Sequence, residues 1–291
     1  MSINQTRPDT DQHKAGIALF LVGLLGFAFF DAASKQLLET YPAPFLNVVR
    51  YATVCLVAIV LWLRNPRGPV PSGYRSLLVA RGTALGIVGT CFMSALIWMP
   101  LAEATAIYFT SPLLVVALSP WFLNERVSSA KWVAVLIGFA GMLLIVRPGN
   151  TLPWLGTLLM VISAMSFALF QLLTRRLAGH VPTHVQYGST AVICLIITGL
   201  PAPFFLPQPW PDPLTLLMIV GISSTNALAQ VLLLAAFKRV QASTLAPMNY
   251  FQLLIALIIG ATWFKQPPDT LALLGMALIT AAGLYLARRP V

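Results

Sequence analysis

The sequence predicts an all-helical, multi-pass membrane protein, and three observations carry that prediction. Only 9% of the 291 residues are charged, whereas an ordinary soluble domain carries about 25% charge. Hydrophobic residues make up 58% of the chain, and they occur in runs of about 20, the length that a helix needs to cross a bilayer. These runs do not alternate apolar and polar residues, as the strands of a membrane barrel would. A soluble fold of this composition would have almost no polar surface.

Ten apolar runs are separated by polar or proline-rich breaks, and we expect each run to form one membrane-spanning helix. In chain order the expected helices are Gly16–Leu38, Phe45–Leu63, Leu77–Met99, Ala104–Leu123, Ser129–Val146, Trp154–Leu173, Val185–Phe205, Leu214–Phe237, Thr244–Phe264 and Leu271–Ala287. The tail at residues 1–14 has no basic segment followed by a small-residue cleavage site, so we expect no signal peptide. Cys55, Cys91 and Cys194 fall inside runs, which predicts buried thiols rather than disulfides.

Basic residues gather on alternate breaks, and this pattern predicts the orientation of the chain. They are Arg7 and Lys14 before the first run, Arg64, Arg67 and Arg75 after the second, Arg126 and Lys131 after the fourth, Arg175 and Arg176 after the sixth, Lys238 and Arg239 after the eighth, and Arg288 and Arg289 after the tenth. The other breaks hold only Lys35, Arg147 and Lys265. By the positive-inside rule both termini are expected in the cytoplasm. Membrane orientation thus accounts for the net charge of +10, and no nucleic-acid partner is expected.

The chain contains two copies of one unit. Matching segments recur at an offset of 140 early in the unit (167 − 27) and 142 later (250 − 108). The matches are Phe27–Lys35 with Phe167–Arg175, Pro42 with Pro182, Tyr108–Phe109 with Tyr250–Phe251, Trp121–Phe122 with Trp263–Phe264, and Gly141–Pro148 with Gly283–Pro290. The copies, residues 15–148 and 153–290, each hold five runs. Because five is odd, the second copy starts on the opposite side of the membrane, an arrangement typical of alternating-access transporters.

Two segments of the first copy carry a resemblance to a known family. "SPLLVVALSPWFLNERVS", which contains Glu125 and Arg126, and "GFAGMLLIVRPG" resemble the EamA domains of the drug/metabolite transporter superfamily. The resemblance extends from about Gly16 to Pro290, but the second copy has Pro267 at the position equivalent to Glu125. Within the superfamily the chain is most similar to the YddG-type exporters of amino acids and related metabolites. This resemblance implies alternating access through a central cavity.

Pro112 and Pro247 each lie inside an apolar run. A proline removes a backbone hydrogen bond, and the freed carbonyl is tolerated only beside neighbouring helices or a water-filled cavity. Pro112 and Pro247 are therefore candidate hinges, although Pro112 follows Tyr108 whereas Pro247 precedes Tyr250. The alternative is that these prolines only shape helix packing.

Polar side chains inside the runs predict a substrate cavity, because each is costly in lipid and should face the interior. Helical spacing aligns Ser223, Asn226 and Gln230 on one helix face, and Asn249 and Gln252 on another. The candidate cavity residues are Tyr108, Ser111, Gln171, Ser223, Asn226, Gln230, Asn249, Tyr250 and Gln252. The alternative is that the amides hydrogen-bond to one another and hold helices together.

Few charges lie within the runs. Asp31 is one helical turn from Lys35 and also within the expected reach of Arg50, so we predict a structural ion pair among these residues. Arg81 is expected to extend to the cytoplasmic surface, and Glu103 to be solvated at a break. Because Asp31 is the one carboxylate well inside a run and has nearby cations, we expect little dependence of transport on a proton gradient.

Catalytic patterns are not evident in the sequence. His180 and His184 are two potential ligands without a third, which is too few for a zinc site. We therefore predict no metal, no cofactor and no enzymatic activity; an intramembrane enzyme is disfavoured. The prediction is a monomeric exporter in the inner membrane for small neutral or zwitterionic metabolites, amino acids first, aromatic and hydrophobic ones included. A proton-coupled exporter of drugs or other metabolites is the alternative.

Overall fold

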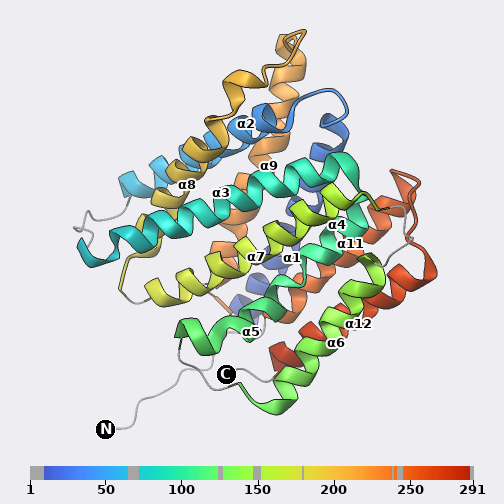
Figure 1. Cartoon of the computed structure of the whole chain (residues 1–291). Helices are drawn as coiled ribbons and strands as arrows, with labels where there is room; N and C mark the ends of the chain where they lie inside the picture. Colours follow the sequence, from blue (N-terminus) through green and yellow to red (C-terminus); the bar gives the residue numbers. More distant parts are fainter. Residues whose placement is uncertain are drawn as a thin grey trace.

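A computed structural model describes residues 10–64, 72–123, 127–146, 152–178, 180–237, 239–240 and 245–288 of the chain. Every regular element in these ranges is a helix (Figure 1). Eight helical segments are long and apolar enough to cross a membrane, and two shorter apolar helices cover Tyr250–Thr262 and Thr270–Leu286. The predicted all-helical, membrane-spanning class is therefore confirmed over the described ranges.

The α-helices follow the predicted runs, with shifts of a turn or more at the start of α1 and α11 and at the end of α7 and α8, and with one run divided between two helices. They are α1 (Thr10–Leu37), α2 (Ala43–Arg64), α3 (Arg75–Trp98), α4 (Leu101–Tyr108), α5 (Ser111–Leu123), α6 (Ser129–Val146), α7 (Trp154–Leu177), α8 (Thr183–Gly199), α9 (Pro213–Phe237), α11 (Tyr250–Thr262) and α12 (Thr270–Arg288). Short 3₁₀ helices are η1 (Ser72–Tyr74), η2 (Ala202–Phe204) and η3 (Ala246–Asn249).

Several helices begin at residues that suit a helix N-terminus. Pro153 and Pro182 directly precede α7 and α8, where a missing backbone N–H costs nothing. Asp212 caps α9, because its carboxylate accepts hydrogen bonds from the backbone N–H groups of Leu214 (3.1 Å) and Thr215 (3.3 Å). The Thr215 hydroxyl donates to the same carboxylate, and these bonds hold the pKa of Asp212 below its ordinary value.

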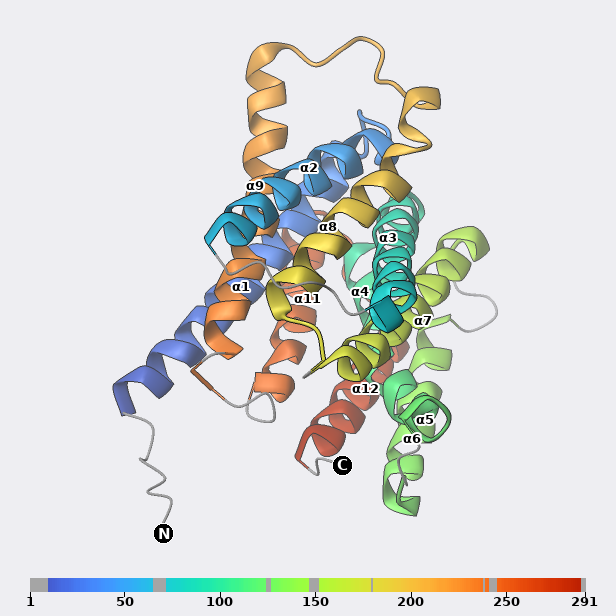
Figure 2. The same cartoon turned by 90° about the vertical axis from the view of Figure 1, so that its left-hand side faces the viewer.

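The largest helix contacts occur in matched pairs. Contacts of α3 with α7 match those of α1 with α9, and contacts of α3 with α8 match those of α2 with α9. If each helix of α1–α6 is exchanged with the helix at the same place in α7–α12, each of these contacts becomes its match. The contact of α6 with α12 and the contact of α2 with α8 are unchanged by this exchange. Figure 1 and Figure 2 show α6 beside α12, and α2, α8 and α9 grouped at the other end. This is the contact pattern that a two-fold relation between the segments produces.

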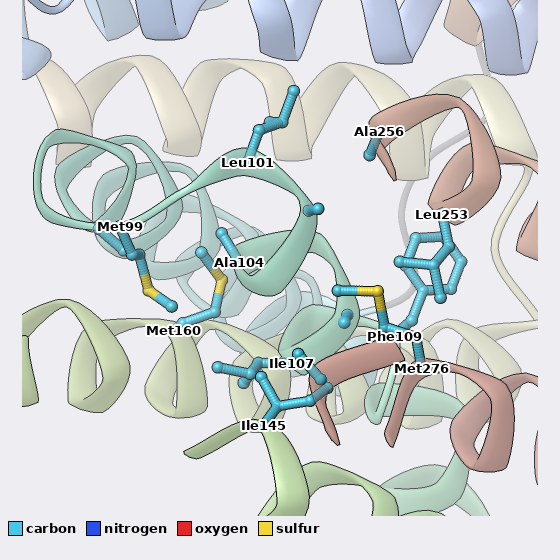
Figure 3. Close-up of a cluster of buried hydrophobic side chains, with 14 of the residues drawn as sticks. Met99, Leu101, Ala104, Ile107, Phe109, Ile145, Met160, Leu253, Ala256 and Met276 are labelled. Atoms are coloured by element: carbon cyan, nitrogen blue, oxygen red, sulfur yellow. The ribbon is translucent and has the colours of Figure 1, made fainter. Parts of the chain in front are cut away.

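The main apolar core surrounds α4. Every residue from Leu101 to Ile107 is buried, so this short helix is enclosed on all sides. Figure 3 shows Ile107 beside Ile145 of α6, and Phe109 near Met276 of α12. Large apolar side chains such as Leu136 and Leu217 are instead exposed on the outside, where a bilayer would cover them.

One predicted helix, Ala104–Leu123, is divided into α4 and α5. The break lies at Phe109 and Thr110, where the Thr110 hydroxyl donates to the Ile107 carbonyl (2.6 Å) and the Thr110 carbonyl accepts from the Leu113 N–H (2.9 Å). Pro112 is the second residue of α5, a position in the first turn that tolerates proline. It therefore begins a new helix instead of bending a continuous one. In the second copy, Pro247 falls within η3, directly before α11.

Candidate substrate site

A guanidinium–amide network connects the two copies between α2 and α9. Arg50 Nε donates to Asn226 Oδ1 (3.4 Å), and Gln230 Nε2 donates to the same oxygen (3.4 Å). Asn226 is 1% exposed, and its Nδ2 has no hydrogen-bond partner among the described residues. The structure thus brings together two residues of the predicted polar stripe on α9, and it leaves one buried donor group unused.

Aromatic rings cover the Arg50 end of this network. The guanidinium carbon lies 4.7 Å from the ring centroid of Phe30 and 5.2 Å from that of Tyr51. Cation–π contacts of this kind stabilise a charge that is partly removed from water. Arg50 is therefore held by α1, α2 and α9 together.

The predicted ion pair of Asp31 with Lys35 is replaced by other contacts. Lys35 Nζ donates to the backbone carbonyls of Leu96 (3.0 Å) and Met99 (2.8 Å) at the end of α3. Terminal helix carbonyls lack partners within the helix, so a lysine satisfies them well. Asp31 instead accepts a hydrogen bond from Gln252 Nε2 of α11 (3.1 Å). Arg50 lies within electrostatic range of Asp31, but no ion pair between them is present in the described part of the chain.

The two repeated tyrosines occupy different surroundings. The Tyr108 ring lies between Phe167 (4.9 Å between centroids) and Phe92 (5.3 Å) and remains partly exposed. Tyr250 is 5% exposed, packs 5.6 Å from Phe109, and fills the space left by the missing side chain of Gly283. Its hydroxyl has no hydrogen-bond partner within the described ranges. Tyr108 therefore lies at the edge of the apolar core, whereas Tyr250 is inside it.

The remaining predicted cavity residues are dispersed. Ser111 opens α5 and Ser223 lies on α9; both are buried, and the Ser223 carbonyl accepts from the Thr53 hydroxyl (3.3 Å). Gln171 on α7 and Asn249 at the end of η3 are partly exposed.

A small cavity of about 60 Å³ adjoins the network at Gln230. Ligand pockets usually measure about 300–1,000 Å³, so this space admits only part of a solute. Its lining residues come from α2, α3, α7, α8 and α9. They are Tyr51, Val54, Arg81, Leu85, Phe170, Tyr187, Thr190, Ala191, Cys194 and Gln230.

Arg81 is the charged cavity residue among those that the sequence did not predict. We expected it to extend to the cytoplasmic surface, but it is only 8% exposed. Nε donates to the Thr174 hydroxyl (2.7 Å), and Nη1 donates to the Gln186 carbonyl (2.9 Å). The expectation is wrong because acceptors on α7 and α8 hold the guanidinium inside the bundle. The sequence did contain a signal: Arg81 lies inside an apolar run, and its own helix contains no acidic residue that could pair with it.

Glu103 also differs from expectation. It was predicted to be solvated at a break between runs, but it lies in the first turn of α4 and is 7% exposed. Its Oε2 has no hydrogen-bond partner in the described ranges. The helices that enclose α4 remove this carboxylate from solvent.

Similar proteins cover nearly the whole chain. An S-adenosylmethionine uptake transporter of Rickettsia bellii is 27% identical over 277 residues, 94% of both chains. A pseudopaline exporter of Pseudomonas aeruginosa is 28% identical, covering 96% of this chain and 98% of the relative. A riboflavin transporter of Rhizobium johnstonii is 29% identical, covering 98% and 96%. These relatives are transporters, not enzymes.

A solved structure has the same fold, and a family model matches both halves of the chain. The solved structure, 21% identical, has a TM-score of 0.63 over 93% of this chain and 98% of its own, which shows a common fold. Two successive segments, residues 14–147 and 154–288, match one family, described as EamA-like transporters. The chain is therefore a multi-pass membrane protein of the EamA-like transporter family.

Proposed function

We propose that this chain is a secondary transporter that exports small neutral or zwitterionic metabolites, with amino acids as the first candidates. The observation that carries the proposal is the network of Arg50, Asn226 and Gln230, which joins the two copies. The unused amide donor of Asn226 and the neighbouring cavity supply hydrogen-bonding groups within an apolar bundle. A buried polar group without a partner carries a desolvation penalty, which a bound solute would relieve.

The proposed architecture is ten helices in two inverted units, residues 15–148 and 153–290, with both termini in the cytoplasm. The exchangeable helix contacts support a two-fold relation between these units. Under alternating access, the units rock about a site near the bilayer midplane. Pro112 and Pro247, which lie beside the α4–α5 break and in η3, are the proposed hinges. The protein acts as a monomer in the cytoplasmic membrane.

Aromatic and polar groups together suit a zwitterion with an apolar body. Tyr108 and Phe167 offer ring surface for such a body or for an amino group. The remaining proposed cavity groups are Ser111, Gln171, Ser223, Asn226, Gln230, Asn249, Tyr250 and Gln252. The relatives named above include both uptake and export, and S-adenosylmethionine itself carries an amino-acid group.

Counterflow in proteoliposomes tests this proposal. Vesicles loaded with an unlabelled solute would be offered labelled L-phenylalanine, L-methionine, S-adenosylmethionine or riboflavin. We expect exchange of at least one amino acid in wild type and a loss of exchange in Asn226→Ala, because that variant removes the shared acceptor of Arg50 and Gln230. Empty vesicles are the control. Exchange of riboflavin without exchange of any amino-acid solute would overturn the proposed substrate class.

Asp31 would be the coupling site of a second candidate function, that of a proton-coupled exporter. Its hydrogen-bond partner is the neutral amide of Gln252 instead of Lys35. Arg50 lies within electrostatic range of Asp31, and our first proposal remains a flux that depends little on the proton gradient. The measurement compares flux with and without an imposed pH difference in wild type and Asp31→Asn. Accumulation driven by the pH difference in wild type and abolished by Asp31→Asn would establish the second candidate.

A further inference from the structure

The small cavity next to Gln230 is lined by one positively charged side chain and by no acidic one among the described residues. Its lining residues lie on α2, α3, α7, α8 and α9, and the sequences of these helices contain no aspartate or glutamate. Among the described lining residues, Arg81 is the charged one. A charged side chain at membrane depth is costly and usually has a partner of opposite charge or a functional role. Arg81 has no ion-pair partner in the described part of the chain.

Neutral groups hold the Arg81 guanidinium in place. Nε binds the Thr174 hydroxyl, and Nη1 binds the Gln186 carbonyl and the Thr190 hydroxyl. The Phe170 ring centroid lies 4.4 Å from the guanidinium carbon. These bonds use the N–H groups of Nε and Nη1, so both N–H groups of Nη2 remain without a partner among the described residues. The donors are thus oriented before any ligand arrives.

A second polar group that lines the cavity also lacks a hydrogen-bond partner among the described residues. The Tyr187 hydroxyl is buried and has no hydrogen-bond partner in the described ranges, and Tyr187 lines the cavity together with Gln230. The cavity of about 60 Å³ holds a few water-sized groups and is far smaller than the usual ligand pocket of about 300–1,000 Å³. This space suits a carboxylate group better than a whole amino acid.

The internal repeat provides a comparison with Arg50. Arg81 stacks on Phe170 and Arg50 stacks on Phe30, and the two phenylalanines are 170 − 30 = 140 residues apart, the offset of the repeat. Arg50 has Asp31 within electrostatic range. Arg81 has no such acid in the described part of the chain. The two phenylalanines correspond in the repeat, whereas both arginines belong to the first copy. Of the two arginines, Arg81 is the one without an acidic neighbour among the described residues.

We propose that Arg81 forms the anion subsite of the transport cavity, where it binds the carboxylate of the substrate. This inference rests on the proposed function and narrows it: the transported solute carries a carboxylate or an equivalent oxyanion. The carboxylate accepts hydrogen bonds from Nη2 and from the Tyr187 hydroxyl, while the apolar body of the solute extends toward Gln230. A guanidinium is well suited to this role because its charge is permanent and its donors match a carboxylate.

Paired probes test the subsite by transport. Wild-type protein in proteoliposomes should exchange L-phenylalanine at least tenfold better than L-phenylalaninamide, which lacks the carboxylate. Arg81→Gln should weaken the apparent affinity for L-phenylalanine by about tenfold to hundredfold, the range for a hydrogen bond to a charged group, and leave the amide unaffected. Arg75→Gln is the matched control, because Arg75 is exposed on the same helix, and it should behave like wild type. Equal exchange of acid and amide by wild type would overturn the subsite and leave the proposed function standing.

A measurement without transport separates the two proposals. Cys194 lines the cavity and is a free thiol, so a variant with Cys55→Ala and Cys91→Ala would report on the charge there. In detergent, an anionic methanethiosulfonate reagent should modify Cys194 faster than a cationic one. Arg81→Gln should reduce that preference, while Arg50, which also lies within electrostatic range of Cys194, retains part of it. Arg81→Lys, which retains the charge, should keep the preference even if Arg81→Gln fails to fold. An anion preference without any amino-acid exchange would support the subsite and overturn the proposed function. Equal reagent rates in the folded variant with Cys55→Ala and Cys91→Ala would overturn the subsite.

Discussion

Asn226 and Tyr250 are both buried polar residues, yet their surroundings predict different roles. Asn226 accepts hydrogen bonds from Arg50 and Gln230, so its removal would break a polar network beside the cavity. Tyr250 belongs to the main apolar core and packs against Gly283. From spacing alone the two side chains look equivalent, but Tyr250 also packs the apolar core, so its truncation should cost stability whatever its contact with a solute.

Gln230 and Tyr250 should therefore respond differently to truncation. Gln230→Ala should reduce transport and leave thermal unfolding near wild type, because this side chain is only partly buried and makes one long hydrogen bond (3.4 Å). Tyr250→Ala should lose about 3–5 kcal/mol of stability, as large aromatic deletions in cores do. Tyr250→Phe, which keeps the ring, should remain folded. Transport assays and thermal unfolding of purified variants provide both readouts. Misfolding of Gln230→Ala would show that the amide holds helices together.

Pro120 removes one backbone hydrogen bond from the interior of α5, and a neighbouring hydroxyl replaces it. Pro120 has no N–H for the carbonyl four residues earlier, that of Val116. The Ser119 hydroxyl donates to this carbonyl (3.0 Å). A helix in an apolar environment can therefore continue through a proline when a neighbouring hydroxyl replaces the lost bond.

This repair predicts coupling between two adjacent residues. Ser119→Ala should destabilise the protein by about 1 kcal/mol, the usual net value of a hydrogen bond. In a Pro120→Ala background the same substitution should have little effect, because the new backbone N–H can bind the Val116 carbonyl. A double-mutant cycle by thermal unfolding measures the difference. Additive effects would mean that the Ser119 hydroxyl does not replace the missing bond.

The contact between α6 and α12 depends on glycines. A Cβ atom at Gly275 would collide with the Gly141 carbonyl oxygen, and one at Gly141 would lie 2.7 Å from the Gly275 oxygen. Small residues at such crossings allow two helix backbones to approach closely. The α6–α12 contact therefore needs glycine at both positions.

Gly275→Ala should separate α6 from α12 and cost about 1–3 kcal/mol, the range for an overpacked interior. Gly221→Ala is the control, because a Cβ atom there meets nothing within 4 Å. The control should be neutral or slightly stabilising, since alanine is the better helix former. Thermal unfolding compares the two variants. Equal melting temperatures would show that the helices can shift apart without penalty.

At the scale of the whole molecule, orientation follows from charge. The basic breaks predict that both termini and the loop near His180 lie in the cytoplasm. Single cysteines at Gly68, which lies outside the described residues, and at His180 should resist an impermeant thiol reagent in intact cells. A protein without Cys55, Cys91 and Cys194 is the background, and labelling after permeabilisation is the control. Labelling of either site from outside would refute the inverted arrangement.

Local sequence properties predicted the all-helical membrane class and the approximate position of each apolar helix along the chain. Apolar length and periodicity predict membrane helices because a bilayer sets the length of every spanning segment. Internal repeats predicted two related units, and the helix contacts are consistent with them. Polar spacing also placed Asn226 and Gln230 on one face, since helix geometry alone decides which residues share a face.

Tertiary structure alone decided which partners the buried charges have. Lys35 binds the end of α3 across more than 60 residues, and Arg81 binds acceptors on α7 and α8 across 93 to 109 residues. Glu103 is buried because distant helices enclose α4. Hydrogen bonds at such separations depend on how helices pack, and a linear pattern contains no information about which neighbour supplies an acceptor. The apolar runs could therefore be predicted from the sequence, whereas the cavity beside Arg81 is formed only by the packing of five helices.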